Sequence, residues 1–186
     1  RVARYDIKLT DHGTPHSGVR VPFLNYSGLR PETFDFMNVD RWRPNSSGTS
    51  TFRFDEAEQA VKVSTVFAAE AGKGGKDYWV FPEYVLDLPK ESLVGAVAIS
   101  LDLKFQQGNG STLVKSPLVM FAYQDANEKG RYDSVTYGKP TGEWQRFTVP
   151  IDATKTDRYK MVRIGMCPTQ PRIDYWMRKI TLHYGK

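Results

Sequence analysis

The chain is poor in cysteine and histidine and has no long apolar run. Its single cysteine, Cys167, excludes an internal disulfide and a multi-cysteine zinc site, and we interpret it as a small buried side chain. The three histidines lack the HExxH spacing of a zinc enzyme, and neither a GxSxG nucleophile turn nor a GxxxxGKS phosphate loop occurs. No apolar run reaches the roughly 18 residues that a membrane-spanning helix needs, so we expect no membrane span.

Long helical periods are also absent. No segment longer than about ten residues keeps apolar residues at the 3.6-residue period, whereas turn residues recur at strand-like spacing. About nine or ten consecutive strands without intervening helices predict antiparallel layers packed face to face. We therefore expect an all-β fold: an antiparallel β-sandwich over residues 32–186, preceded by an irregular lead-in segment over residues 1–31.

The charge of the chain is positive but dispersed. The formal net charge is +5, and the 26 lysines and arginines are spread along the sequence. This dispersion argues against a nucleic-acid partner, which a clustered basic segment would favour. The sequence begins at Arg1 without an initiator methionine, so we expect a processed secreted protein or a domain cut from a longer chain.

Alternating apolar residues predict the individual strands. Residues 52–67 predict a hairpin with a polar tip, and residues 94–105 and 117–124 predict two further strands, the second in the middle of a sheet. Residues 78–88 predict a long apolar strand, in which Pro82 indicates an edge position or a bulge.

The segment over residues 142–151 has the clearest alternation. Its apolar residues Phe147, Val149 and Ile151 fall on one face, which predicts a strand with that face in a core. We expect the opposite face to be free for solvent or ligand, and to be where function lies. That face carries Trp144, Arg146 and Thr148.

Three motifs resemble those of a known group of binding domains. The first is the segment 34–44 followed by the strand 60–64, the second is 142–151, and the third is 173–184. In order and spacing they are similar to the jelly-roll carbohydrate-binding modules of secreted bacterial polysaccharide-processing proteins, a galactose-binding-domain-like group. The resemblance implies a jelly-roll sandwich, a secreted, periplasmic or cell-surface location, and a neighbouring catalytic domain.

The resemblance also implies a structural calcium, which such modules commonly hold between their first and last strands. Asp35 and Asp174 match the positions of its carboxylate ligands. Calcium needs several oxygen ligands in a compact site, and the alternative for Asp35 is a turn or surface residue.

Sugar recognition needs flat aromatic rings against the C–H face of a pyranose, together with a few polar groups for its hydroxyls. The alternative for each aromatic residue is a place in the core. The aromatic candidates are Trp42, Trp79, Trp144, Trp176, Tyr84, Tyr123, Tyr132 and Tyr137. Among all candidates we expect the ligand-binding residues to be Trp79, Tyr84, Tyr123, Arg146 and Arg163.

Four basic residues each lie opposite the apolar face of their predicted strands: Lys104, Arg146, Arg163 and Lys179. If these strands share a sheet, the cations form one surface suited to an acidic or sulfated polysaccharide. The alternative is a solvated face that keeps strand edges from aggregating.

The function that we predict is non-catalytic binding of a polysaccharide or oligosaccharide, with no required cofactor. One alternative is a jelly-roll polysaccharide lyase or glycoside hydrolase, in which Tyr123, Arg146 and Arg163 could surround a uronate. Another is a structural accessory domain that uses exposed apolar residues of 78–88 to pack on a catalytic neighbour.

Overall fold

The computed structural model describes residues 10–11, 14–15, 34–45, 48–68, 78–106, 113–136, 138, 141–169 and 171–185. Residues 69–77, 107–112 and Tyr137 lie outside the described residues, as does the predicted lead-in segment 1–31 apart from 10–11 and 14–15. In the described part, no helix has the length and apolar character that crossing a bilayer requires.

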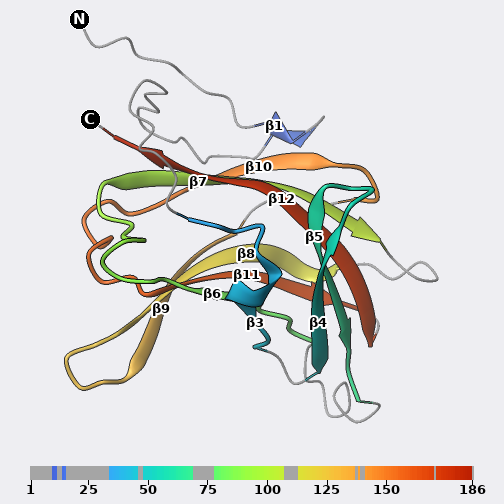
Figure 1. Ribbon diagram of the computed structural model, residues 1–186, viewed down its shortest axis with the longest axis horizontal. Coiled ribbons are helices and arrows are strands. Elements are labelled where there is room, and N and C mark those ends of the chain that lie inside the picture. Colours follow the sequence, from blue (N-terminus) through green and yellow to red (C-terminus); the bar gives the residue numbers. More distant parts are fainter. Residues whose placement is uncertain are drawn as a thin grey trace, which may run out of the picture.

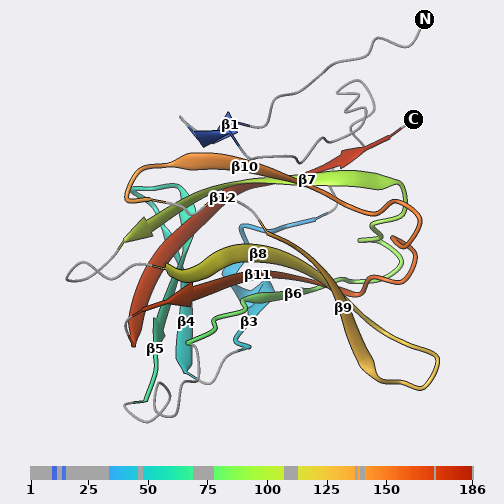
Figure 2. The same cartoon turned by 180° about the vertical axis from the view of Figure 1, so that it is seen from behind.

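Two five-stranded antiparallel sheets stack face to face, as Figures 1 and 2 show. We name each sheet after its middle strand. The β12 sheet has the order β10 (Gln145–Pro150), β7 (Ala96–Gln106), β12 (Arg172–Tyr184), β5 (Ala60–Val66) and β4 (Thr49–Asp55). The β11 sheet has the order β3 (Trp42–Arg43), β6 (Glu83–Val85), β11 (Met161–Pro168), β8 (Leu113–Gln124) and β9 (Gly130–Thr136).

Two small elements accompany the sandwich. The strands β1 (Thr10–Asp11) and β2 (Thr14–Pro15) form a separate two-stranded ladder beside β10. A 3-10 turn, η2 (Val39–Arg41), leads into β3, and the Asn38 side chain caps it by accepting from the Asp40 amide.

The core between the sheets consists of the inward residues of both layers. On β7 the side chains of Ile99, Leu101, Leu103 and Phe105 are at most 1% exposed, as the predicted strand 94–105 requires. The inward residues of β10, predicted from 142–151, are also buried: Phe147, Val149 and Ile151. The fold class and these two strands are thereby confirmed.

Two other predicted strands are also as expected, and one is wrong. The hairpin over residues 52–67 is β4 and β5, and β8 lies between β11 and β9, inside its sheet. The predicted long strand over 78–88 is reduced to β6 and an isolated bridge between Val80 and Met166. Pro82 lies between the two and has no N–H to donate, so only its carbonyl takes part by accepting from the Ile164 amide.

Candidate functional site

The β11 sheet turns one face away from the core. Val162, Ile164 and Met166 of β11 are buried inward, so the alternating residues Arg163 and Gly165 point outward. The strand register places the outward residues of the other strands beside these two. We call this surface the outer β11 face, and its residues are Arg43, Trp79, Phe81, Glu83, Val85, Leu118, Met120, Tyr132, Ser134, Met161, Arg163 and Gly165.

An aromatic pair lies at one end of this face. The rings of Trp79 and Phe81 stack with centroids 5.0 Å apart and planes 9° from parallel. The Phe81 ring lies directly on Gly165, where an added Cβ would meet Phe81 Cε1 at 2.7 Å and Leu118 Cδ1 at 3.0 Å. Both stacked residues are only partly buried, so the pair offers a flat apolar surface. The Phe81 ring can pack closely on the β11 backbone because Gly165 has no side chain.

Polar groups follow directly along the same strands. Arg163 Nε donates to Glu83 Oε2 at 2.7 Å, and Asn45 Nδ2 donates to the same oxygen at 3.2 Å. The side chains of Arg163 and Glu83 are 21% and 14% exposed, so the pair is held in a fixed orientation at the surface. Such fixed donors and acceptors, beside stacked rings, can orient a hydroxyl-rich ligand.

The face continues past the ion pair in two directions. A cavity of about 450 Å³ adjoins it at the edge of β3 and β6, where Arg43 and Val85 are among its lining residues. Tyr132 of β9 is 59% exposed on the same face. Tyr132 is four residues along and three strands across from Phe81, which corresponds to about 20 Å at ordinary strand spacing. The outward residues of this face therefore extend over about 20 Å.

The outer face of the β12 sheet also carries tryptophans, but their polar atoms are already bonded. Trp144 Nε1 donates to Glu58 Oε2 at 2.8 Å, and Trp176 Nε1 donates to Asp55 Oδ2 at 2.9 Å. Cations lie over the rings: Arg178 is 3.8 Å from the Trp144 centroid, Lys62 is 4.8 Å from that of Trp176, and Lys104 lies over both rings. The hydrogen bonds from Lys104 and Trp144 lower the pKa of Glu58, and that from Trp176 lowers the pKa of Asp55.

The predicted free side of 142–151 therefore lies in an internal network. Besides the bonds of Trp144, Thr148 Oγ1 lies 2.6 Å from Ser100 Oγ, and Arg146 donates to Asp102 at 2.8 Å. Ser100 and Asp102 are 2% and 8% exposed, although their strand pattern predicts an open face. The expectation that this side is free for ligand is wrong for Trp144 and Thr148, because neighbouring side chains cover and bond them.

The structure divides the five predicted ligand-binding residues among different places. Trp79 and Arg163 share the outer β11 face. Tyr84 is fully buried, its hydroxyl donates to Glu91 at 2.7 Å, and burial raises its pKa, so its ring cannot meet a ligand at the surface. Tyr123 lies on the inward side of β8 against Tyr159. Arg146 belongs to the β12 sheet.

The condition for one surface of four cations, that their strands share a sheet, is not met. Lys104, Arg146 and Lys179 belong to the β12 sheet, whereas Arg163 lies on the β11 sheet and is paired with Glu83. The arrangement of Tyr123, Arg146 and Arg163 that a lyase would need around one uronate is likewise not formed, since these residues lie on three different surfaces.

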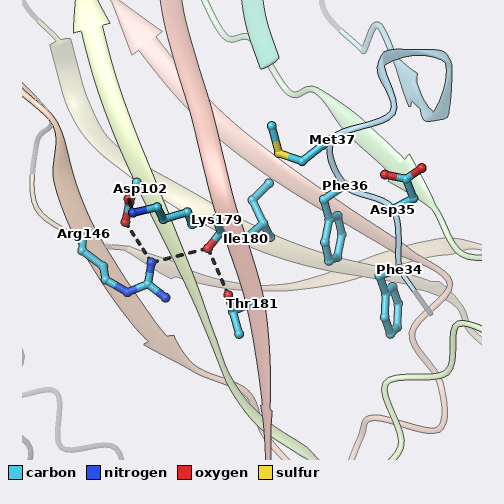
Figure 3. A pocket seen from close by; sticks show the side chains of 9 residues that line it. All are labelled: Phe34, Asp35, Phe36, Met37, Asp102, Arg146, Lys179, Ile180 and Thr181. Carbon is cyan, nitrogen blue, oxygen red and sulfur yellow. Dashed lines mark hydrogen bonds and ion pairs between the residues drawn. The ribbon is translucent and has the colours of Figure 1, made fainter. Parts of the chain in front are cut away.

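Arg146 lines a second cavity, of about 610 Å³, which Figure 3 shows. Asp102, Arg146 and Lys179 lie at one side of it, and the segment from Phe34 to Met37 lies at the other, with Ile180 and Thr181 of β12 between. Arg146 Nη1 also lies 3.4 Å from the Lys179 carbonyl oxygen.

The proposed calcium ligands do not fit a shared ion. Asp35 lines the cavity that Ile180 and Thr181 of β12 also line, whereas Asp174 lies six residues before Ile180 on β12, about 20 Å along the strand. Asp174 lies 3.8 Å from Lys62 instead. Among the described residues, no group of three or more His, Cys, Asp or Glu side chains could hold a metal ion.

Sequence reasoning missed Phe81 and Asn45 as site residues. Phe81 is one of many apolar residues in 78–88, and only the close approach to β11 distinguishes it. One signal was present: Gly165 interrupts an apolar strand, and an isolated strand glycine often marks a place where another group approaches the backbone.

No protein-family model matches the chain, and no curated protein matches it. Several solved structures are similar to the chain. The CBM22-1 xylan-binding domain of Paenibacillus barcinonensis Xyn10C is 15% identical, with a TM-score of 0.52 over 78% of this chain and 86% of that domain. The CBM22-1–GH10 modules of Clostridium thermocellum xylanase 10B, complexed with xylohexaose, are 14% identical, with a TM-score of 0.55 over 81% of this chain and 27% of that one.

A third similar structure is a carbohydrate-binding module of the β-sandwich superfamily described as promiscuous in specificity. It is 8% identical, with a TM-score of 0.56 over 78% of this chain and 58% of that one. At such identities these similarities establish the fold, which is the jelly-roll β-sandwich of carbohydrate-binding modules.

Proposed function

We propose that the protein binds a polysaccharide chain across the outer β11 face, without cleaving it. The observation that carries this proposal is the Trp79–Phe81 stack seated on Gly165 beside the Glu83–Arg163 pair. The rings supply apolar surface for the C–H face of a sugar, and the fixed ion pair and Asn45 supply bonds to its hydroxyls. The similar structures, which include xylan-binding domains, support a glycan as the ligand.

The charge of this face favours a neutral chain. Arg163, the cation nearest the aromatic pair, is compensated by Glu83 at 2.7 Å. A carboxylate of an acidic chain would have to displace Glu83 from a partly buried pair, whereas sugar hydroxyls can bond both partners without separating them.

The enzyme alternative has less support at this face. Glycoside hydrolysis needs two carboxyl groups about 5 to 10 Å apart across the bond. Glu83 is the one carboxylate among the described outward residues of the face, and it accepts from both Arg163 and Asn45. The accessory-domain alternative has one feature in its favour: Leu88, at the end of the segment 78–88, is 43% exposed.

We also propose that the protein acts outside the cytoplasm, next to a catalytic domain that acts on the same polysaccharide. One similar structure joins such a module to a GH10 catalytic module, which supports this arrangement. A shallow site on an open sheet buries little ligand area, so we expect modest affinity. Modest affinity would be enough to keep an attached catalytic domain near its polysaccharide.

Affinity electrophoresis in gels containing xylan, mannan, β-glucan or polygalacturonate tests the proposal. We expect at least one neutral polysaccharide to retard the protein, and Trp79→Ala to restore its mobility. Arg131→Ala, which removes an exposed arginine paired with Asp125 at the far hairpin, is the matched surface control and should be retarded normally. Equal retardation of Trp79→Ala and the unmodified protein would contradict the proposed face, and shortening of the polysaccharide would favour the enzyme alternative.

A further inference from the structure

We propose that the cavity between β12 and the segment 34–37 is a second binding site, specific for a uronate, a sugar that carries a carboxylate. It lies on the β12 sheet and does not depend on the outer β11 face. Its volume of about 610 Å³ is within the range of small-molecule sites. Figure 3 shows Asp102, Arg146 and Lys179 at one side, and Phe34, Asp35, Phe36 and Met37 across from them.

A β-bulge in β12 gives the charged side its composition. On β7, two residue steps separate Ser100 from Asp102, whereas three steps separate their β12 partners Thr181 and Arg178, so β12 has one extra residue there. The extra residue allows Lys179 to lie on the same side as Arg178, although consecutive strand residues normally face opposite ways. Lys179 adopts a left-handed backbone with φ of 48°, which non-glycine residues rarely do.

With the bulge in place, the carboxylate of Asp102 is close to three cations: Arg178 and Lys179 of β12, and Arg146 of β10. Asp102 lies 2.8 Å from Arg146 Nη1, 3.6 Å from Arg178 Nε and 4.0 Å from Lys179 Nζ. Arg178 Nε is buried and has no hydrogen-bond partner in the part of the chain that the structure describes. Arg146 and Lys179 remain 44% and 68% exposed and line the cavity, so on their side of it two exposed cations accompany the single carboxylate of Asp102. Strained backbone and bulges occur preferentially at functional sites.

The rest of the lining suits a sugar ring. Phe34, Met37 and Ile180 provide apolar contacts, and the Phe34 ring is held by stacking on Phe36 at 5.4 Å. The Thr181 hydroxyl, which donates to the Lys179 carbonyl at 3.1 Å, lies at the same wall as a partner for sugar hydroxyls. Asp35 is on the opposite side of the cavity from Arg146, as Figure 3 shows, so the carboxylate of the ligand would bind at the Arg146 and Lys179 side.

The test is a titration of the full chain with sodium glucuronate, followed by the amide chemical shifts in two-dimensional NMR at low salt. We expect saturable shifts for residues near Lys179, and at least tenfold weaker binding of glucose and of acetate at matched sodium concentration. Added salt should weaken the glucuronate binding, because the cations are exposed. Absence of saturable shifts, or acetate binding as tight as that of glucuronate, would overturn the proposal.

Lys179 is 68% exposed, so we expect its variants to fold normally and to report on binding alone. Lys179→Gln should weaken glucuronate binding at least tenfold, and Lys179→Arg should restore it. The matched control is Lys155→Gln, at an exposed lysine paired with Asp133 and Asp152, and it should bind as the unmodified protein does. Unchanged binding by Lys179→Gln would also overturn the proposal. Trp79→Ala should keep glucuronate binding while losing the neutral polysaccharide, so the two sites fail separately.

Discussion

The outer faces of the two sheets differ in what their tryptophans do. On the β12 sheet, Trp144 and Trp176 donate to carboxylates and lie under cations, so both the ring faces and the N–H groups have protein partners. On the β11 sheet, Trp79 stacks on Phe81 and both remain partly exposed. An outward tryptophan is therefore not in itself a binding residue, since its available surface depends on the side chains that neighbouring strands place beside it.

Replacing one tryptophan on each face should give the largest and most distinct effects. Trp176→Ala should lower the free energy of unfolding by about 3–5 kcal/mol, because the side chain is 5% exposed and Oδ2 of Asp55 would lose the hydrogen bond that Trp176 donates. Trp79→Ala should cost less than about 1 kcal/mol of stability, since the ring is partly exposed. Chemical denaturation of both variants measures the two values.

For polysaccharide affinity we expect the opposite order, with the larger loss in Trp79→Ala. Loss of the apolar ring contact of Trp79 should cost about 2 kcal/mol of affinity for the retarding polysaccharide, or about 30-fold in Kd. Trp176→Ala should bind with unchanged Kd once the concentration is corrected for the folded fraction. If isothermal titration calorimetry shows the larger loss in Trp176→Ala, then the β12 sheet is the polysaccharide-binding face.

Adding a methyl group at Gly165, beneath the Trp79–Phe81 stack, tests whether the position of this stack controls binding at the outer β11 face. Gly165→Ala would place its Cβ 2.7 Å from Phe81 Cε1, so the Phe81 ring and the Trp79 ring stacked on it must shift. We expect a stability loss of about 1–3 kcal/mol from overpacking and a rise of about fivefold in Kd. Calorimetry and thermal unfolding measure the two changes.

Gly130→Ala is the matched control for this substitution. It adds the same methyl group on β9 of the same sheet, where no atom of the described residues lies within 4 Å of the new Cβ. It should leave both stability and affinity nearly unchanged. An affinity loss as large in Gly130→Ala as in Gly165→Ala would mean that the seating of Phe81 on Gly165 does not control binding.

The layers of the fold were predictable because they depend on alternation, which the sequence shows directly. The period of two in β7 and β10 was enough to place Ile99, Leu101, Phe147 and Val149 inward. Alternation did not predict the structure of the segment 78–88, because its apolar residues lie on both faces of the sheet. Tyr84 packs into the core, whereas Phe81 lies outside on Gly165.

The site was only partly predictable, because it depends on which strands share a sheet. Alternation gave the outward direction of both Arg146 and Arg163, yet the strand order places them on opposite sides of the sandwich. Periodicity predicted the outward direction of Arg163, and residue type alone made Trp79 a candidate; the structure places both on the outer β11 face. The ion pair of Arg163 with Glu83 required the long-range register between β6 and β11, which a local pattern does not contain.

The smallest effect that we predict is a pH dependence confined to the β12 sheet. His183 is 7% exposed, and its Nε2 lies 2.7 Å from Ser100 Oγ, which in turn lies 2.6 Å from Thr148 Oγ1. Burial, and then the charge of Arg146, lower the pKa of His183 below its ordinary value of 6.5. In the unfolded chain the imidazole takes up a proton near pH 6.5, whereas in the folded protein it stays neutral to lower pH.

The unfolded state therefore binds more protons in that window, and stability falls as the pH drops below about 6.5, by at most about 1.4 kcal/mol per pH unit. His183→Gln, which keeps a hydrogen-bonding group without a titratable one, should flatten this slope. Denaturation between pH 7.5 and pH 5 measures it, a window above the lowered pKa values of Asp55 and Glu58. The Kd at the outer β11 face, corrected for the folded fraction, should not change between unmodified protein and His183→Gln at any of these pH values. A shift in that Kd would show that the two faces are coupled, and the contrast between a bonded face and a binding face would then no longer hold.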